Sequence, residues 1–575
     1  MESEGTGTGT SDVTAFRTRY DAVIVGGGHN GLVAAAYLAR AGQAVLLLER
    51  DDELGGATTS RRVFPGMDAR LSRYSYLVSL LPPAIVEDLG LRFRTRQRRI
   101  ASCTPYDDAG VARALLLSNV DDEASGQALR ALAGEDERRG YERLMELERA
   151  FAALVWPSLL QPLRSRREWR GALRTPLERE AWDAFVERPL GETLERLVQN
   201  DLLRGVLFTD AKIGIFTHPH DATLLQNRCF IYHIIGQGTG EWQVPIGGMG
   251  ALVEALSGSA RAGGAQLVAS APVEAVRTGR PRHTVVFHHE GREQVVEATR
   301  VLVNAGPQVF AHLLGEPYAP EPADEGSVCK VNMLLRRLPR LKAADIDPRD
   351  AFAGTFHVDE GYGQMLRGYA RAANGELPAE PPAEIYCHTL TDDSILSPEL
   401  RAAGYHTLTL FGLDAPYRLF ERDNEVPKAL FLRRYLDRLN RVLADPIEEC
   451  LATDANGDLC VEIKTPRDLE RDVALNRGNI FHGALSWFFA EDDGAGTTGT
   501  AGTTGTAGTA GTTGTTGTTG TTGTTGTTGT TGTWGVGTPY ERVYRCGASA
   551  QRGGAVSGIP GRNAAQQIFE ELRSH

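Results

Sequence analysis

The chain has 575 residues, of which 61 are Lys or Arg and 73 are Asp or Glu, giving a formal net charge of −12. This length suggests several structural units around a large core, and the acidic balance disfavours nucleic-acid binding, which normally needs a basic patch. No run of 18 apolar residues is present, so we expect no transmembrane helix.

The first predicted elements form a β-α-β unit behind a polar lead-in. Residues 1–17 are rich in Gly and Thr and are expected to be disordered. The start, MESEGTGTGTSD, is neither basic nor apolar, which favours a cytoplasmic protein. A strand at Asp21–Val25, an Ala-rich helix and a second strand at Ala44–Leu48 follow. This order predicts a parallel sheet and an α/β fold.

The turn between the first strand and the helix carries a G-x-G-x-x-G motif. Gly26, Gly28 and Gly31 form the motif, and Glu49 ends the second strand close to the expected spacing of about 20 residues. Glycines let the backbone approach a pyrophosphate at the helix N-terminus, and the carboxylate accepts hydrogen bonds from ribose hydroxyls. The motif therefore predicts a dinucleotide-binding site.

The middle of the chain alternates helical and strand patterns. Residues 120–207 have apolar side chains at helical spacing, which favours a solvated helical layer. The apolar stretch Phe151–Leu160 leaves peripheral membrane contact as an alternative. Further on, we expect separate strands at Val295–Ala298 and Val301–Asn304, and an alternating strand at Ser327–Leu335.

The last part of the chain contains a low-complexity tract and a glycine-rich loop. Residues 494–533 consist mostly of Gly and Thr, so we expect a flexible surface insertion without chemistry. A strand, a Gly-rich loop and a helix start follow within residues 544–565. The seven cysteines are scattered with no C-x-x-C pair, which predicts no disulfide framework, no zinc ribbon and no local redox pair. No metal site is predicted.

The segment after Glu49 reads ERDDELGGA, and here the sequence resembles FAD-dependent oxidoreductases of the glutathione reductase and amine oxidase type. Together with PIGGMGAL, GNIFHGAL and the C-terminal loop, it is most similar to the phytoene desaturase-like branch related to pyridine nucleotide-disulphide oxidoreductase domain-containing protein 2. The resemblance implies a discontinuous Rossmann-like FAD-binding domain with an inserted mixed α+β substrate domain. It also implies that FAD, not NAD, is the cofactor.

The resemblance places the FAD-binding residues in four parts of the chain. They are Gly26, Gly28, His29, Asn30 and Gly31 in the first turn; Glu49, Arg50, Gly55, Gly56 and Ala57 after the second strand; Val273, Ala305 and Gly306; and Gly547, Ala548, Gly554, Val556, Gly558, Ile559 and Asn563 in the C-terminal loop and helix. Ala548 stands where related enzymes often have an acid that binds the ribityl chain.

Two residues are candidates for a catalytic role. Lys330 shares a strand face with Asn332, and the resemblance implies a counterpart of the amine oxidase lysine that assists flavin reoxidation. An ordinary surface lysine is the alternative. His482, in the segment NIFHGAL, is either a structural histidine or a pocket-lining acid or base.

The predicted domains follow from these assignments. Residues 18–85, 235–310 and 534–575 are expected to form the FAD-binding domain. Residues 86–234, mainly helical, and 311–493 are expected to form the substrate domain.

The predicted function is FAD-dependent hydride transfer from a CH–CH bond of a small, hydrophobic substrate. No second nucleotide-binding unit is predicted, so oxygen, a quinone or a carrier protein is the expected electron acceptor. Two alternatives remain. One is an amine oxidase that acts on a CH–NH bond. The other is a non-catalytic regulatory or binding protein on the same scaffold, as in the Rab GDP-dissociation inhibitors. The oligomeric state is not predicted.

Overall fold

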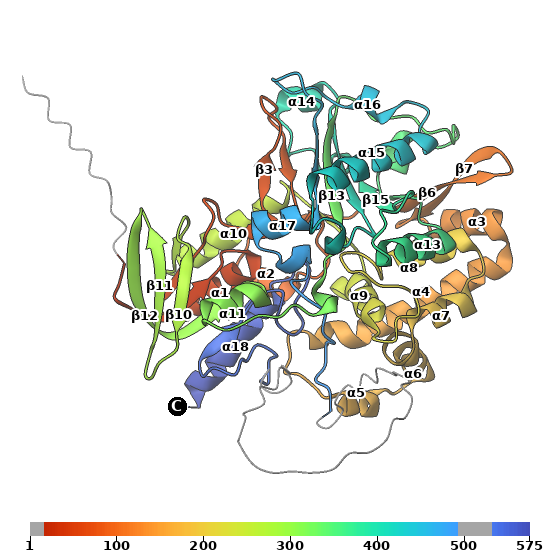
Figure 1. The fold of residues 1–575 in the computed structure, drawn as a ribbon. Helices are drawn as coiled ribbons and strands as arrows, with labels where there is room; N and C mark the ends of the chain where they lie inside the picture. The colour runs from red at the N-terminus through yellow and green to blue at the C-terminus, as the bar shows by residue number, and fades with distance from the viewer. Residues whose placement is uncertain (1–15, 493–531, 575) are drawn as a thin grey trace, which may run out of the picture.

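The computed structural model describes residues 16–492 and 532–574, and its first sheet is a Rossmann-like sheet assembled from distant parts of the chain (Figure 1). The strand order is β10-β11-β12-β1-β2-β9, and β18 pairs with β12. The strands are β1 (Arg19–Val25), β2 (Val45–Leu48), β9 (Gln266–Val268), β10 (Val273–Arg277), β11 (His283–His289), β12 (Arg292–Val303) and β18 (Val543–Arg545). The pairs β9-β2, β2-β1, β1-β12 and β12-β18 are parallel.

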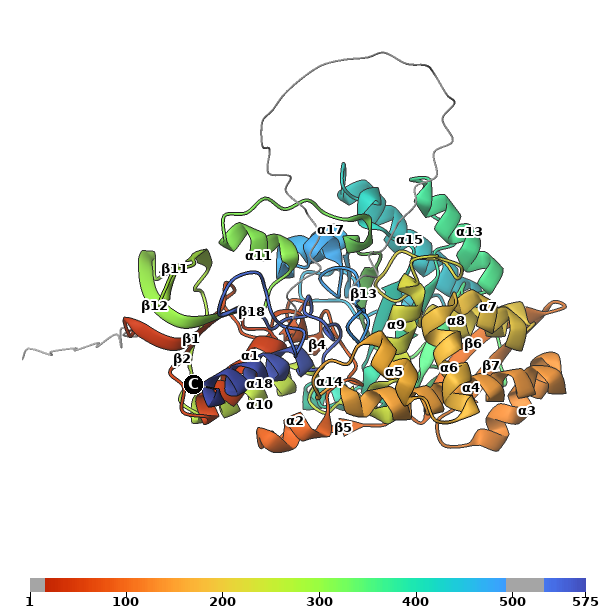
Figure 2. The same ribbon diagram turned by 90° about the horizontal axis from the view of Figure 1, so that it is seen from below.

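Both faces of this sheet are buried, as parallel strands require. Helices α1 (His29–Arg40), α10 (Met249–Ala262) and α18 (Ile559–Arg573) lie together on one face, as Figure 2 shows. On the other face, β10 and β11 fold over the sheet and α11 (Pro307–Leu313) packs beside them. The short helix α2 (Pro83–Asp88) adds Ile85 to the first of these cores.

The expected break between Val295–Ala298 and Val301–Asn304 is wrong, because β12 is one continuous strand. Its first half pairs with β11 in an antiparallel ladder, and its last residues pair with β18 on the same side. Along its other edge, β12 pairs with β1 from Glu297 to Val303. This continuous pairing stabilises the extended conformation of the polar residues Thr299 and Arg300.

The second sheet has seven strands in the order β17-β13-β16-β15-β14-β6-β7. They are β6 (Ile100–Asp108), β7 (Val111–Ser118), β13 (Cys329–Leu335), β14 (Thr355–Val358), β15 (Ala383–Tyr386), β16 (His406–Gly412) and β17 (Val461–Lys464). One face is apolar and packs against α15 (Glu425–Val442) through Phe431 and Leu439. The other face points into a cavity. Two small sheets, β3 (Ser60–Arg62) with β4 (Arg70–Ser72) and β5 (Thr95–Arg96) with β8 (Val244–Pro245), complete the strands.

A layer of helices covers the far side of that cavity. It comprises α3 (Asp122–Ala133), α4 (Glu135–Val155), α5 (Arg166–Ala172), α6 (Pro176–Trp182), α7 (Leu190–Leu197), α8 (Asp201–Thr209) and α9 (Leu225–Ile234). Around the second sheet lie α12 (Pro348–Ala351), α13 (Tyr362–Ala373), α14 (Pro398–Ala402), α16 (Ile447–Cys450) and α17 (Pro466–Val473). The predicted α/β class, with a discontinuous Rossmann-like domain and an inserted mixed domain, is confirmed.

The apolar stretch Phe151–Leu160 contributes to the core of the helical layer, where Phe151, Val155 and Leu159 are buried. In the described ranges, none of the helices combines the length and the apolar character needed to cross a membrane.

Helix α18 crosses α1 at a point where only a glycine fits. A Cβ atom on Gly561 would lie 2.1 Å from the carbonyl oxygen of Asn30. We therefore expect Gly561→Ala to force the helices apart and to lower the free energy of unfolding by about 1–3 kcal/mol. Urea denaturation followed by circular dichroism measures this change. Gly171→Ala is the control, because a Cβ on Gly171 meets nothing within 4 Å; equal stability of the two variants would contradict the prediction.

Candidate dinucleotide site and adjoining cavity

The glycine turn after β1 is built around the side chain of Asn304. Gly26 has φ +99°, and a Cβ there would lie 2.5 Å from the Asn304 carbonyl oxygen. A Cβ on Gly31 would lie 2.2 Å from the Gly26 carbonyl oxygen. The Asn304 amide donates to the carbonyl oxygens of Gly26 at 3.1 Å and Gly28 at 3.4 Å. Gly26 and Gly31 are therefore needed by the fold itself.

Gly28 is different, because its side of the turn is open. Its φ is −65°, and a Cβ there would meet only the Asn304 amide nitrogen at 3.1 Å and the Gly55 carbonyl oxygen at 3.9 Å. The Gly55 amide donates to the Gly27 carbonyl at 2.9 Å, so Gly55 and Gly56 run alongside the turn. Three glycines thus line a groove at the N-terminus of α1, which is the shape a pyrophosphate needs.

Glu49 lies at the rim of this groove. It is buried, and its carboxylate accepts hydrogen bonds from the backbone amides of Gly27 at 2.6 Å and Asp51 at 2.9 Å. Burial raises the pKa of this carboxyl. Arg50 points away and donates to the Asp472 carbonyl at 3.3 Å. Val273 begins β10, just beyond Ala271, whose amide donates to the Glu49 carbonyl at 2.7 Å.

The C-terminal loop returns to the same place. A Cβ on Gly547 would lie 2.7 Å from the Asn304 side-chain oxygen, and the Ser549 hydroxyl donates to the Ala305 carbonyl at 3.1 Å. Gly306 is the N-cap of α11. Gly554 and Gly558 both have positive φ, and Gly558 leads into Ile559 at the start of α18.

Asn563 lies apart from the other predicted residues. Its buried amide donates to the Leu159 carbonyl at 3.3 Å, so it ties α18 to the helical layer. Arg552, in the loop before α18, is also buried and donates to the Phe488 carbonyl at 3.0 Å and the Leu159 carbonyl at 3.3 Å. Burial lowers the pKa of Arg552 to about 10. No role was predicted for this residue from the sequence.

A cavity of about 410 Å³ adjoins the glycine groove. On the groove side it is lined by His29, Ala57, Ala548 and Val556, which come from three of the four predicted segments, and by the catalytic candidate His482. The cavity then continues between the second sheet and the helical layer. Buried atoms without a hydrogen-bond partner among the described residues include Nε2 of His29, Oδ1 of Asn30 and Nδ1 of His482. These orphaned atoms fit a polar ligand at the groove.

The two histidines at the groove are neutral at physiological pH. Burial lowers the pKa of both His29 and His482 to about 4. Nδ1 of His29 lies 3.0 Å from the Thr58 hydroxyl, which holds the ring beside the turn. His482 has φ +64°, a left-handed conformation that is costly for a residue other than glycine.

Lys330 is buried, which overturns its interpretation as a surface lysine. Its Nζ donates to the carbonyl oxygens of Ser72 at 3.1 Å and Tyr74 at 2.7 Å, and it lies 4.4 Å from the Tyr76 ring centroid. Burial lowers the pKa of this amine well below its usual value. The Ser75 amide donates to the Ala57 carbonyl at 3.1 Å, so Lys330 lies close to the groove side of the cavity.

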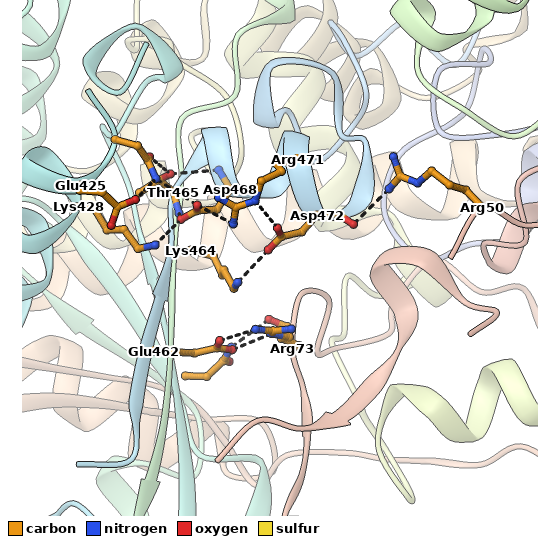
Figure 3. Close-up of polar contacts among 12 residues, drawn as sticks. Arg50, Arg73, Glu425, Lys428, Glu462, Lys464, Thr465, Asp468, Arg471 and Asp472 are labelled. Carbon is orange, nitrogen blue, oxygen red and sulfur yellow. Dashed lines mark hydrogen bonds and ion pairs between the residues drawn. The ribbon is translucent and has the colours of Figure 1, made fainter. Parts of the chain in front are cut away.

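The segment that Lys330 holds is also fixed by an ion pair, drawn in Figure 3. The Arg73 guanidinium donates to both oxygens of Glu462, at 3.0 and 2.8 Å, and the Asn332 amide donates to the Arg73 carbonyl at 3.1 Å. A second group of charges, Lys464, Arg471 and Asp472, joins β17 to α17 and reaches Arg50 beside the groove. These contacts fasten the second sheet to the Rossmann-like part.

The cavity floor contains polar residues that sequence reasoning missed. In the sheet register, Lys330 pairs with Phe411, Phe411 with Glu384, and Glu384 with His357, so the four residues form one row on the cavity face. Each lies on a different strand. The alternating pattern of AEIY at residues 383–386 could have indicated a strand with Glu384 on its polar face. The register of that strand with β14 and β16 cannot be predicted from the sequence.

No metal site was predicted, yet the structure brings two groups of possible ligands together. Glu274, His288 and Glu293 form one mainly exposed group. His357, Glu360 and Glu384 form a buried one, in which one ligand atom of each residue lies within 4.8 Å of the others.

Gly28 allows cofactor binding to be separated from folding. We expect Gly28→Val to lose its dinucleotide with a smaller loss of thermal stability than Gly31→Val, because its Cβ meets the protein closely only at the Asn304 amide nitrogen, 3.1 Å away. Gly31→Val should lower the melting temperature more, since its Cβ meets the Gly26 carbonyl. Cofactor released on denaturation and the melting temperature measure the two effects. A fully loaded Gly28→Val protein would contradict the assignment.

Comparison with known proteins agrees with this geometry. A family model described as an NAD(P)-binding Rossmann-like domain matches residues 24–84. An uncharacterized protein of Mycobacterium tuberculosis (strain ATCC 25618 / H37Rv) is 44% identical over 96% of this chain and 98% of its own length. Pyridine nucleotide-disulfide oxidoreductase domain-containing protein 2 of Mus musculus is 30% identical over 97% of this chain and 95% of its own.

Among solved structures, putrescine oxidase bound to putrescine superposes with a TM-score of 0.52, at 18% identity, over 97% of this chain and 99% of that one. This likeness shows a shared fold. The resemblance inferred from the sequence is confirmed: the chain belongs to the family of pyridine nucleotide-disulfide oxidoreductase domain-containing protein 2.

Proposed function

We propose that this protein is an FAD-dependent oxidoreductase that takes a hydride from an organic substrate bound in the cavity. The observation that carries the proposal is that His29 and Ala57, which directly follow Gly28 and Gly56 in the chain, line the cavity together with Ala548 and Val556. FAD extends from a pyrophosphate-binding turn to a redox-active ring, and this arrangement gives the ring a place beside a substrate. The ERDDELGGA segment and the C-terminal loop support FAD over NAD.

The residues of the chain have distinct roles in this proposal. Gly28 and Gly56 leave room for the pyrophosphate, and Glu49 is placed for the ribose hydroxyls. The N-terminus of α18 offers backbone amides and a positive dipole to the ring. When bound, FAD supplies the hydride acceptor.

Lys330 is proposed to have a positioning role. It donates to the carbonyl oxygens of Ser72 and Tyr74, and burial lowers the pKa of its amine well below the usual value. The helical layer and the second sheet exclude bulk water around it.

A CH–CH donor is the first form of the proposal. Tyr76, Leu77, Phe411, Leu475 and Phe481 give the cavity a mainly apolar and aromatic wall, which suits a hydrophobic substrate. A specific observation favours the CH–NH alternative: Glu384 lies on the same wall and offers a partner to an amine. Oxygen, a quinone or a carrier protein is the proposed electron acceptor.

The first experiment is an absorption spectrum of the purified protein, followed by identification of the cofactor released on denaturation. We expect the two visible bands of bound FAD. Anaerobic addition of isoprenoid-like alkenes and of alkylamines should then bleach the bands for one class. A colourless protein that also does not bind added FAD would overturn the proposal and favour a non-catalytic binding or regulatory protein.

Lys330→Met tests the proposed position of the lysine beside the flavin. We expect reoxidation by oxygen to slow by about 100-fold, because a positioned proton-transfer group typically contributes at least that much. Stopped-flow measurement of the reoxidation half-reaction gives the rate, and the flavin content shows whether the site is intact. Lys342→Met, on an exposed lysine, is the matched control. Unchanged reoxidation with full flavin content would remove Lys330 from this role.

A further inference from the structure

The end of the cavity away from the glycine groove is lined by Glu384 and His357, and Glu360 lies beside them. Glu384 and Glu360 are 1% and 2% exposed, and His357 beside them is 3% exposed. Glu384 accepts hydrogen bonds from the hydroxyls of Thr209, at 3.1 Å, and Tyr386. His357 pairs with Glu360 through its Nδ1. These contacts place two carboxyl groups and one imidazole at the end of the sheet row that begins at Lys330.

More acidic than basic groups surround this end. Glu148 from α4 and Asp210 from the end of α8 also line the cavity, whereas Arg98 and His357 are the basic groups that face Glu384 among the described residues. Arg98 is held by the Thr355 hydroxyl at 3.1 Å and lies over the Tyr386 ring. Burying carboxylates is costly unless cations or hydrogen bonds compensate.

The pKa values at this end of the cavity favour bound protons. Although burial opposes the shift, the charge of Glu360 raises the pKa of His357. Burial and the neighbouring Glu360 raise the pKa of Glu384 to about 8, and burial also raises the pKa of Glu148. A cationic group that entered the cavity would stabilise the ionised form of Glu384 and release its proton.

A second observation, independent of the charge count, points to a missing ligand. Oε1 of Glu360 is buried and has no hydrogen-bond partner among the described residues, although Glu360 is fixed through its other oxygen to His357. Buried carboxylate oxygens are normally satisfied. One oxygen or nitrogen from each of His357, Glu360 and Glu384 lies within 4.8 Å of the others. A single donor group placed between the two carboxyl groups would therefore reach both.

We propose that Glu384 and Glu360 form a subsite for a cationic nitrogen group, an ammonium or guanidinium, at the end of the substrate distant from the flavin. His357 holds Glu360 in place through its Nδ1. The proposal rests on the proposed function for the position of the flavin and deepens it by naming the substrate class. An ammonium offers several N–H donors in different directions, which matches the acceptors Glu384 and Glu360.

The sheet geometry sets the length of this substrate. Glu384 lies two strands from Lys330 and His357 lies three strands away, which corresponds to about 10 and 14 Å at about 4.8 Å per strand. Phe411 fills the position between Lys330 and Glu384 and offers an apolar surface to the middle of the substrate. The substrate class is therefore a flexible chain or ring system with a cationic group roughly 10 Å from the carbon that is oxidised.

Binding of n-octylamine and 1-octanol to the flavin-loaded protein tests the subsite. Anaerobic isothermal titration calorimetry measures both ligands, which share an apolar chain and differ in charge. We expect octylamine to bind at least tenfold more tightly than octanol. Because Glu384 loses a proton on amine binding, the measured heat should also differ between phosphate and Tris buffers, whose ionisation enthalpies differ.

Glu384→Gln and Glu360→Gln remove one charge each at nearly constant shape. We expect octylamine binding to weaken by about 10–100-fold, which corresponds to the roughly 1.5–3 kcal/mol of a hydrogen bond to a charged group. Octanol binding should stay unchanged, and Glu384→Gln should lose the buffer dependence of the heat. Glu376→Gln, on an exposed turn after α13, is the matched control and should bind both ligands as the wild type does.

The outcomes separate the subsite from the flavin assignment. Equal binding of amine and alcohol, or equal weakening of both by each Glu→Gln variant, would overturn the subsite. Stoichiometric Zn²⁺ or Mn²⁺ binding that Glu384→Gln abolishes would replace it with a metal site. A protein that prefers octylamine but carries no flavin would retain the subsite and overturn the proposed function. A protein whose flavin is reduced by substrates but which binds amines no better than alcohols would retain the proposed function and overturn the subsite.

Discussion

The close packing around Asn304 is the constraint on which the two-domain structure depends. Its side chain binds the carbonyl oxygens of Gly26 and Gly28, and a Cβ on Gly547 would nearly touch it. The turn after β1, the end of β12 and the C-terminal loop therefore meet at one amide. Because these segments are far apart in the chain, the Rossmann-like part can close only after the intervening segments have folded back. The groove and the cavity share one boundary for the same reason.

The sequence predicted the parts whose signals are local. The glycine spacing after a short apolar strand indicated the turn, and the continuation ERDDELGGA indicated which kind of dinucleotide enzyme resembles this chain. The exact boundaries of the strands were harder to predict. We expected two strands in place of β12 because its middle is polar. The structure stabilises that middle by pairing with β1, which is distant in the chain. Lys330 was placed on the correct strand face, but its burial depends on the carbonyl oxygens of Ser72 and Tyr74, which no local pattern reveals.

The acidic end of the cavity was not predictable, because it is a property of the register between strands. Glu384, Phe411 and Lys330 lie on three strands that are separated in the chain by loops and helices. In the sequence, Lys330 and Glu384 each look like the solvent-facing residue of a strand with alternating polar and apolar side chains. The structure shows that the opposite face packs against α15 and that the expected solvent face is covered by the helical layer. A pattern that normally means exposure therefore means a cavity in this fold.

Burial shifts pKa values in opposite directions at the two ends of that cavity, because it disfavours charged bases at one end and charged acids at the other. At the groove end it lowers the pKa values of His29, His482 and Lys330, because desolvation disfavours their charged forms. At the far end it raises the pKa of Glu384 to about 8. A substrate with a single cationic group is stabilised in only one orientation, with its charge at Glu384 and its uncharged carbon chain toward the flavin. In this proposal the charged group fixes the orientation of the substrate and thereby the carbon that faces the flavin. The aromatic wall contributes binding energy that is the same for either orientation.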